Sequence, residues 1–117
     1  MTFEDLNLNK NILKAESEMG YTEPTPIQEQ AIPIILNELD LIGCAQTGTG
    51  KTAAFAIPII HHLHKLGTNS KRTKKVRALV VTPTRELAIQ IGENFDTYGK
   101  YTNITQTTIF GGVSQLP

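Results

Sequence analysis

The chain has 117 residues, of which 39% are hydrophobic and 19% charged, and this composition excludes a disordered segment. Eleven basic residues balance eleven acidic ones, so the overall charge does not attract nucleic acid. A single cysteine excludes a disulfide framework, and every apolar run is shorter than the roughly 18 residues of a membrane span. The N-terminus carries no signal pattern either, so we expect a cytoplasmic protein without a membrane partner.

Two helices are expected in the first forty residues. Asn9 is a suitable N-cap for a helix over residues 10–19, which the following glycine ends. Thr25 and Gln28 have the spacing of a capping box, with a proline at the first position of the second helix. A further proline inside this helix, Pro33, predicts a break or a kink before another short helical turn.

A short apolar run over residues 41–45 predicts a buried strand. It leads into the stretch 45–52, which reads Ala-Gln-Thr-Gly-Thr-Gly-Lys-Thr and opens an alanine-rich, apolar helix. A strand, a glycine turn and a helix start are the context of a phosphate-binding loop. The strict pattern asks for glycine where Ala45 stands, and the alternative is an ordinary turn with an incidental lysine.

The chemistry of this stretch suits a phosphate chain. Gly48 and Gly50 can take backbone angles closed to other residues, so that successive N–H groups point into one concavity. The first turn of the following helix adds further unpaired N–H groups. Lys51 offers a positive charge to the β and γ phosphates, and the hydroxyl of Thr52 suits a Mg²⁺ ligand position.

The helix after this loop is expected to run from residue 50 towards residue 64, with a bend at Pro58. Its histidines are more typical of a solvated helix end than of a metal site: His61, His62 and His64. Residues 65–77 hold six basic side chains and no acidic one. We expect a polar loop over residues 67–75, and this basic run is either solvated or a patch that contacts nucleic acid.

The second half of the chain alternates strand and helix. Residues 76–81 have the apolar, β-branched character of a parallel strand buried on both faces. A helix is expected over residues 85–100, followed by a third strand over residues 104–110. Strands that alternate with helices, without hairpin signals, predict an α/β fold with a doubly wound parallel sheet.

Four short segments stand in a fixed order along the chain. They are residues 20–28 (Gly-Tyr-Thr-Glu-Pro-Thr-Pro-Ile-Gln), residues 45–52, residues 83–88 (Pro-Thr-Arg-Glu-Leu-Ala) and the pair Gly111-Gly112. Together they resemble the Q motif, motif I, motif Ia and GG segment of the DEAD-box RNA helicases. Phe3 takes the place of an isolated upstream aromatic in that family, and Ala45 is the family's usual residue at its position.

The resemblance implies a site for ATP and Mg²⁺. A glutamine amide carries both a donor and an acceptor, so it can pair bidentately with N6 and N7 of adenine. The resemblance gives that role to Gln28, with the capping box as the alternative, and it lets Phe3 stack on the adenine, with a place in the core as the alternative. It implies nucleotide contacts for Phe3, Tyr21, Thr25, Gln28, Gln46, Thr47, Gly48, Thr49, Gly50, Lys51 and Thr52. Of these, Lys51 and Thr52 would act in catalysis, and Thr52 would hold the metal.

A second phosphate site is expected where the helix over residues 85–100 begins. N–H groups at a helix start and a guanidinium can together hold a phosphate. The resemblance implies contacts with the RNA backbone, independent of base sequence, for Pro83, Thr84, Arg85, Gly111 and Gly112. The alternative is a capped helix in which Arg85 pairs with Glu86 or a neighbouring carboxylate.

By the same resemblance, residues 1–117 form the N-terminal portion of the first of two RecA-like P-loop domains. The family's Asp-Glu-Ala-Asp segment and its second domain do not occur in these residues. We therefore expect the parent protein to unwind short RNA duplexes with ATP hydrolysis, and this piece alone to be inactive. Unpaired strand edges predict self-association. Two other classes stay open, another P-loop enzyme such as a kinase or GTPase and a non-catalytic nucleotide- or RNA-binding module.

Overall fold

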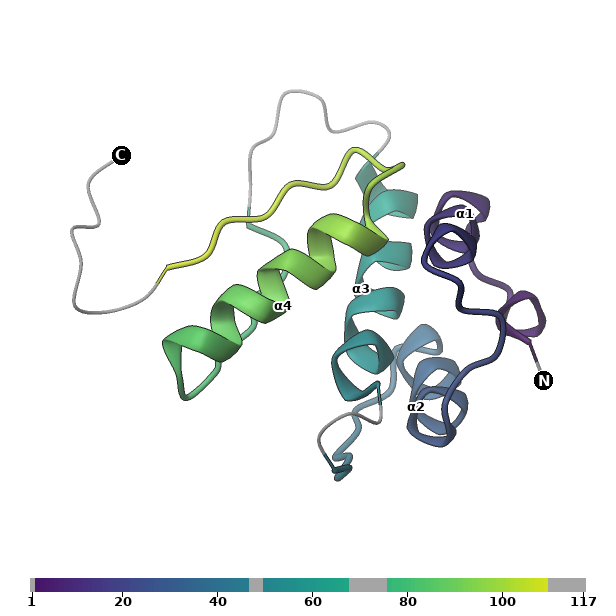
Figure 1. Cartoon of the computed structure of the whole chain (residues 1–117), viewed down its shortest axis with the longest axis horizontal. Coiled ribbons are helices and arrows are strands. Elements are labelled where there is room, and N and C mark those ends of the chain that lie inside the picture. The colour runs from purple at the N-terminus through teal and green to yellow at the C-terminus, as the bar shows by residue number, and fades with distance from the viewer. Residues whose placement is uncertain (1, 47–49, 68–75, 110–117) are drawn as a thin grey trace.

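The computed structural model describes residues 2–46, 50–67 and 76–109, and of residues 65–67 only the backbone. The described residues form a 3-10 helix and four α-helices (Figure 1). These are η1 (Phe3–Leu6), α1 (Lys10–Glu18), α2 (Pro26–Leu36), α3 (Lys51–Gly67) and α4 (Arg85–Tyr98). None of these helices is both long and apolar enough to cross a bilayer.

The predicted start of α1 is confirmed. Asn9 Oδ1 accepts a hydrogen bond from the N–H of Asn11 at 2.8 Å, which satisfies one of the unpaired donors of the first turn. Met19 is the C-cap, so α1 ends one residue before the predicted boundary. Gly20 follows with a φ of +83°, a left-handed conformation that favours glycine.

The prolines inside α2 and α3 do not break these helices, and the expected kink at Pro33 and bend at Pro58 stay predictions. Helix α2 continues through Pro33 and α3 continues through Pro58. A proline inside a helix removes one N–H donor, but here the flanking residues are held by packing. Pro58 is itself fully buried beside Ile57, and α2 packs along α3. Burial of these apolar surfaces outweighs the loss of a single hydrogen bond.

Helix α3 is the centre of the molecule, because it contacts α1, α2 and α4 (Figure 1). Its residues Ala53, Ile57 and Ile60 are buried among apolar side chains from every other helix. The core cluster consists of Phe3, Leu6, Leu8, Ile12, Ile32, Ala53, Ile57, Ile60 and Tyr98. The first turn of α3, which begins at Lys51, therefore belongs to the best-packed element of the described fold.

The three predicted strands are not formed among the described residues. Segments 41–46, 76–82 and 104–109 carry no assigned strand, and residue 110 of the third lies outside the described residues. Large apolar side chains on them are exposed, with Ile42 at 95% and Val76 at 88%. The expectation that residues 76–81 are buried on both faces of a sheet is therefore wrong for the described chain. A helix satisfies its hydrogen bonds internally, whereas a strand needs neighbouring strands to complete its ladder.

The third of these segments runs beside α4 (Figure 1). Gln106 Nε2 donates to Asp96 Oδ2 at 3.1 Å, and Thr108 lies close to Gly92. Helix α4 itself begins as predicted, since Thr84 Oγ1 accepts from the N–H of Leu87 at 3.2 Å. It ends at Tyr98, two residues before the predicted boundary, with Gly99 as its C-cap.

Candidate functional site

Gln28 lies at the junction of α2 and the start of α3, and both ends of its amide are bonded. Its side chain is only 6% exposed. Oε1 accepts from the N–H of Thr25 at 3.0 Å, as the capping box requires. Nε2 donates to the carbonyl of Gly50 at 3.0 Å, across 22 residues of sequence. The amide therefore joins the start of α2 to the end of the glycine-rich stretch.

Of the two glycines in the glycine-rich stretch, residues 45–52, only Gly50 is among the described residues. Thr47, Gly48 and Thr49 lie outside them. Gly50 has a φ of +80°, and a Cβ built on it would lie 2.2 Å from Gln28 Nε2 and 3.1 Å from Thr25 Oγ1. No other residue type fits here without displacing the Gln28 amide. The backbone turns into α3 at this point, and its carbonyl also accepts from the N–H of Ala54 at 3.1 Å.

Lys51 and Thr52 occupy the first turn of α3. The Lys51 side chain is exposed, and its Nζ donates to the carbonyl of Ala45 at 3.0 Å, so it folds back across the base of the glycine-rich stretch. Thr52 is half-buried. Helix α3 is 17 residues long and its first turn presents unpaired N–H groups. An ammonium group, helix N–H groups and a close-fitting glycine form a donor set that suits a polyphosphate.

The remaining predicted nucleotide residues are not all near the surface. Phe3 is 4% exposed and belongs to the core cluster, which is the alternative role stated for it. Stacking on a base would need one face of this ring to become accessible, and it stays a prediction. Tyr21 is 49% exposed, and Gln46 is exposed. The structure therefore brings Thr25, Gln28 and Gly50 together, joins Lys51 to the carbonyl of Ala45, and leaves Phe3 in the interior.

A second polar group lies at the start of α4. An open hollow of about 380 Å³ is lined by residues 79–85 together with Ala88 and Ile109. Thr82 Oγ1 donates to the carbonyl of Thr84 at 2.8 Å, so the two threonines shape the turn into the helix. Pro83, Thr84 and Arg85 are exposed at this end of the hollow. Gly111 and Gly112 lie outside the described residues.

Two of the three histidines of α3, which were expected to be solvated, are half-buried and hydrogen-bonded to backbone groups. His61 Nδ1 accepts from the N–H of Asn9 at 3.1 Å, and His62 Nε2 donates to the carbonyl of Ile35 at 3.1 Å. Both rings therefore attach neighbouring segments to α3, two turns before its end. No group of three metal-ligating side chains occurs within the described parts of the chain.

Two features of α1 were not predicted from the sequence, the burial of Glu16 and the contacts of Glu18. Glu16 is 1% exposed, and burial raises its pKa to about 8. It lies four residues after the buried Ile12, so its place on the apolar face was readable from helical periodicity.

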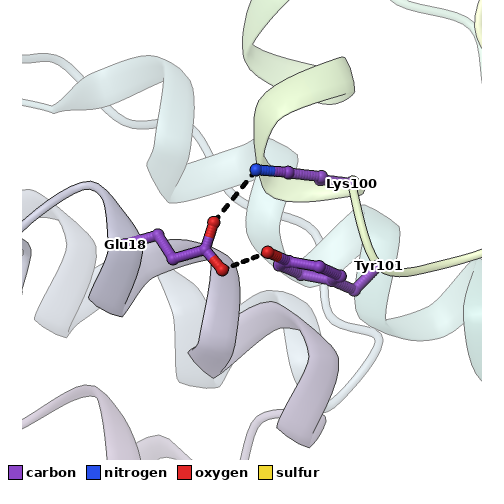
Figure 2. Close-up of polar contacts among 3 residues, drawn as sticks. All are labelled: Glu18, Lys100 and Tyr101. Atoms are coloured by element: carbon purple, nitrogen blue, oxygen red, sulfur yellow. Dashed lines mark hydrogen bonds and ion pairs between the residues drawn. The ribbon is translucent and has the colours of Figure 1, made fainter.

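Glu18 forms a surface cluster with the residues after α4 (Figure 2). Its Oε1 pairs with Lys100 Nζ at 3.0 Å, and its Oε2 accepts from the hydroxyl of Tyr101. These two partners, Tyr101 first, lower the pKa of Glu18. The ammonium of Lys14 lies 4.2 Å from the centre of the Tyr101 ring. The cluster connects α1 to the end of α4, and a long-range pair of this kind has no signal in local sequence.

The chain is similar in sequence to several known proteins. A family model described as DEAD/DEAH box helicase matches residues 25–117. The DEAD-box ATP-dependent RNA helicase RhpA of Helicobacter pylori is 49% identical over 113 residues, which are 97% of this chain and 22% of RhpA. CshA of Bacillus subtilis, also named a DEAD-box ATP-dependent RNA helicase, is 45% identical over 112 residues, 96% of this chain and 22% of CshA. The chain thus spans about a fifth of the length of these relatives.

Solved structures of helicases are also similar to this chain. The RNA helicase Prp28 from Chaetomium thermophilum, bound to ADP, superposes with a TM-score of 0.84 at 39% identity, over 96% of this chain and 27% of that one. A DEAD box protein from Methanococcus jannaschii gives a TM-score of 0.80 at 37% identity, over 97% of this chain and 30% of that one. The arrangement of the described helices is therefore shared with these proteins.

Proposed function

Because the chain belongs to the DEAD/DEAH box helicase family, we propose that it is the ATP-binding and RNA-backbone-binding part of an ATP-dependent RNA helicase. The observation that carries the proposal is the hydrogen bond from Gln28 Nε2 to the carbonyl of Gly50. It supports the proposal because the carboxamide of Gln28, whose donor and acceptor could pair with adenine, contacts the last glycine of the proposed phosphate loop.

Nucleotide binding would exchange bonds that the protein makes with itself. The Gln28 amide would give up at least one of its two partners to pair with N6 and N7 of adenine. Lys51 would leave the carbonyl of Ala45 to meet the β and γ phosphates. Thr52 would hold Mg²⁺. ATP with Mg²⁺ supplies the phosphoanhydride bond whose hydrolysis drives the parent enzyme, while Lys51 and Thr52 orient its charged end.

Residues Phe3, Tyr21, Thr25 and Gln46, and the loop residues Thr47, Gly48 and Thr49, complete the proposed nucleotide site. Thr25 has the closest support among them, since its hydroxyl lies beside Gly50. Phe3 would have to move out of the core to stack on the base. Its role is therefore the most demanding part of the proposal.

RNA would bind at the start of α4. The N–H groups of a helix N-terminus and the Arg85 guanidinium can hold one phosphate, with Pro83 and Thr84 shaping the turn. Gly111 and Gly112 would allow close approach of the same strand. Contacts of this kind grip phosphates and sugars and are independent of base sequence.

At the level of the domain, residues 1–117 would form the N-terminal portion of the first RecA-like domain in a cytoplasmic protein. Segments 41–46, 76–82 and 104–109 would become parallel strands of a doubly wound sheet when further strands pair with them. Their exposed apolar side chains support this proposal. A second RecA-like domain would supply the groups that complete hydrolysis.

ATP turnover with and without RNA tests the proposed function. The full reading frame that contains these residues should hydrolyse ATP, RNA should stimulate the rate, and the 117-residue chain alone should be inactive. Lys51→Ala should lower turnover by on the order of a hundredfold, because it removes a positioned charge from the phosphates. Absence of turnover in both forms would indicate a non-catalytic binding module, and equal use of GTP would indicate another class of P-loop enzyme.

A further inference from the structure

The N-terminal arm, residues 2–20, packs against both α3 and α4. It comprises η1 and α1, and α1 contacts both α3 and α4. Four of its side chains belong to the core cluster: Phe3, Leu6, Leu8 and Ile12. Helix α3 begins at the candidate nucleotide site and α4 begins at the candidate RNA site. The arm therefore packs against the helices that start at these two candidate sites.

The buried face of this arm carries the carboxyl group of Glu16. Glu16 is 1% exposed, and neither of its oxygens has a hydrogen-bond partner among the described residues. The nearby lysines serve other groups, since Lys100 pairs with Glu18 and Lys14 lies over the ring of Tyr101. An ionised carboxylate in such a place is strongly disfavoured, whereas a neutral carboxyl costs far less to bury.

The titratable groups around the arm do not relieve this cost. Burial, and then the neighbouring Tyr21 and Glu16, raise the pKa of Tyr98, so this phenol in α4 stays neutral beside the carboxyl. The arm makes other proton-dependent contacts: Asp5 accepts from the N–H of Thr2, Glu18 pairs with Lys100, and Nδ1 of His61 accepts from the N–H of Asn9.

From this arrangement we propose that the arm is a proton-dependent brace: it docks on α3 and α4 with Glu16 protonated, and it loosens when that carboxyl loses its proton to solvent. The unpartnered burial of Glu16 and the position of the arm across two helices carry the proposal. It stands independently of nucleotide and RNA binding.

The direction of the pH dependence follows from linkage. Burial raises the pKa of Glu16 from its ordinary value of 4.5 to about 8 in the docked arm. Docking is therefore most favourable below pH 4.5 as far as this group is concerned, and it weakens as pH rises towards 8. The opening equilibrium of the arm should increase by up to about tenfold per pH unit inside this window and level off above it.

Amide hydrogen exchange at pH 7.0 and 8.5 tests the brace, because this interval spans the pKa of about 8 that burial gives the Glu16 carboxyl. The 117-residue chain is compared with Glu16→Gln, which keeps the shape of the side chain and removes its titration. The matched control is Glu18→Gln on the exposed face of the same helix. At each pH, the ratio of exchange rates between wild type and variant cancels the intrinsic effect of hydroxide.

For amides of the arm, the ratio of wild type to Glu16→Gln should rise on the order of tenfold from pH 7.0 to 8.5. The ratio for amides of α3 should stay constant, and Glu18→Gln should keep the pH dependence of the wild type. The proposal is overturned if Glu16→Gln and wild type share one pH dependence, or if α3 and the arm change together, since the second result would indicate destabilisation of the whole domain.

Discussion

At the scale of single residues, the amide of Gln28 sets the geometry of the candidate nucleotide site. One of its atoms caps α2 and the other bonds the carbonyl of Gly50, so in the proposed function base recognition and the position of Gly50 would depend on one side chain. A ligand that engages this amide also releases a contact to the loop. If Gln28 recognises the base as proposed, base binding and the backbone at Gly50 would be coupled through this single residue.

Replacing Gly50 by alanine tests this coupling. The new Cβ would lie 2.2 Å from Gln28 Nε2, and the φ of +80° is unfavourable for alanine. We expect the variant to lose about 1–2 kcal/mol of stability from backbone strain and to bind ADP at least tenfold more weakly, because the Gln28 amide is displaced. Thermal unfolding and calorimetric titration measure the two effects.

Gly20→Ala is the matched control for that experiment. Gly20 has a φ of +83°, but nothing lies within 4 Å of its Cβ position. It should show the loss of stability without the loss of ADP affinity. Unchanged ADP affinity in Gly50→Ala, or an equal loss in both variants, would contradict the role given to the Gly50 contact.

Some residue roles could be read from the sequence and others could not. The capping pair at Thr25 and Gln28 depends on spacing within one helix start, and it was predicted. The bond from Gln28 to Gly50 joins residues 22 positions apart, and the capping pattern alone carries no signal for it. Glu16 had a signal in its distance from Ile12, but its charge made a solvated position the ordinary expectation.

At the scale of elements, the helices were predictable and the strands were not. The caps at Asn9 and Thr84 and the glycine after α1 are local features, and each is present where the sequence indicates it. A strand depends on partners elsewhere in the chain. The described residues contain three apolar segments without such pairing, so the sheet predicted from alternating strands and helices is not confirmed in them.

The unpaired segments predict that the isolated chain self-associates. Exposed apolar side chains and free backbone groups favour pairing between copies. Ile42→Lys adds a charge at a side chain that is 95% exposed, so it should reduce the weight-average mass in sedimentation without unfolding the domain. Thr22→Lys adds the same charge at an exposed polar position and should leave the mass unchanged. A monodisperse wild-type monomer would contradict this prediction.

At the scale of the whole molecule, α3 connects the parts that matter for function. Its N-terminus carries Lys51 and Thr52, its apolar face organises the core, and its histidines attach the arm and α2. The helix starts at Lys51 and Arg85 were both predicted to bind phosphates, and both are present as helix N-termini. Displacement of the loop or of the helix behind it would therefore affect every part of the proposed nucleotide site.

The most direct test of this account is the calorimetric titration of the 117-residue chain with ADP and with GDP. Each bidentate contact to a base contributes about 1–3 kcal/mol of discrimination, so ADP should bind at least tenfold more tightly than GDP. Gln28→Ala should largely remove that preference, while Gln30→Ala, an exposed glutamine in the same helix, should keep it. Equal affinity of the wild-type chain for ADP and GDP would contradict the assignment of Gln28 as the residue that recognises adenine.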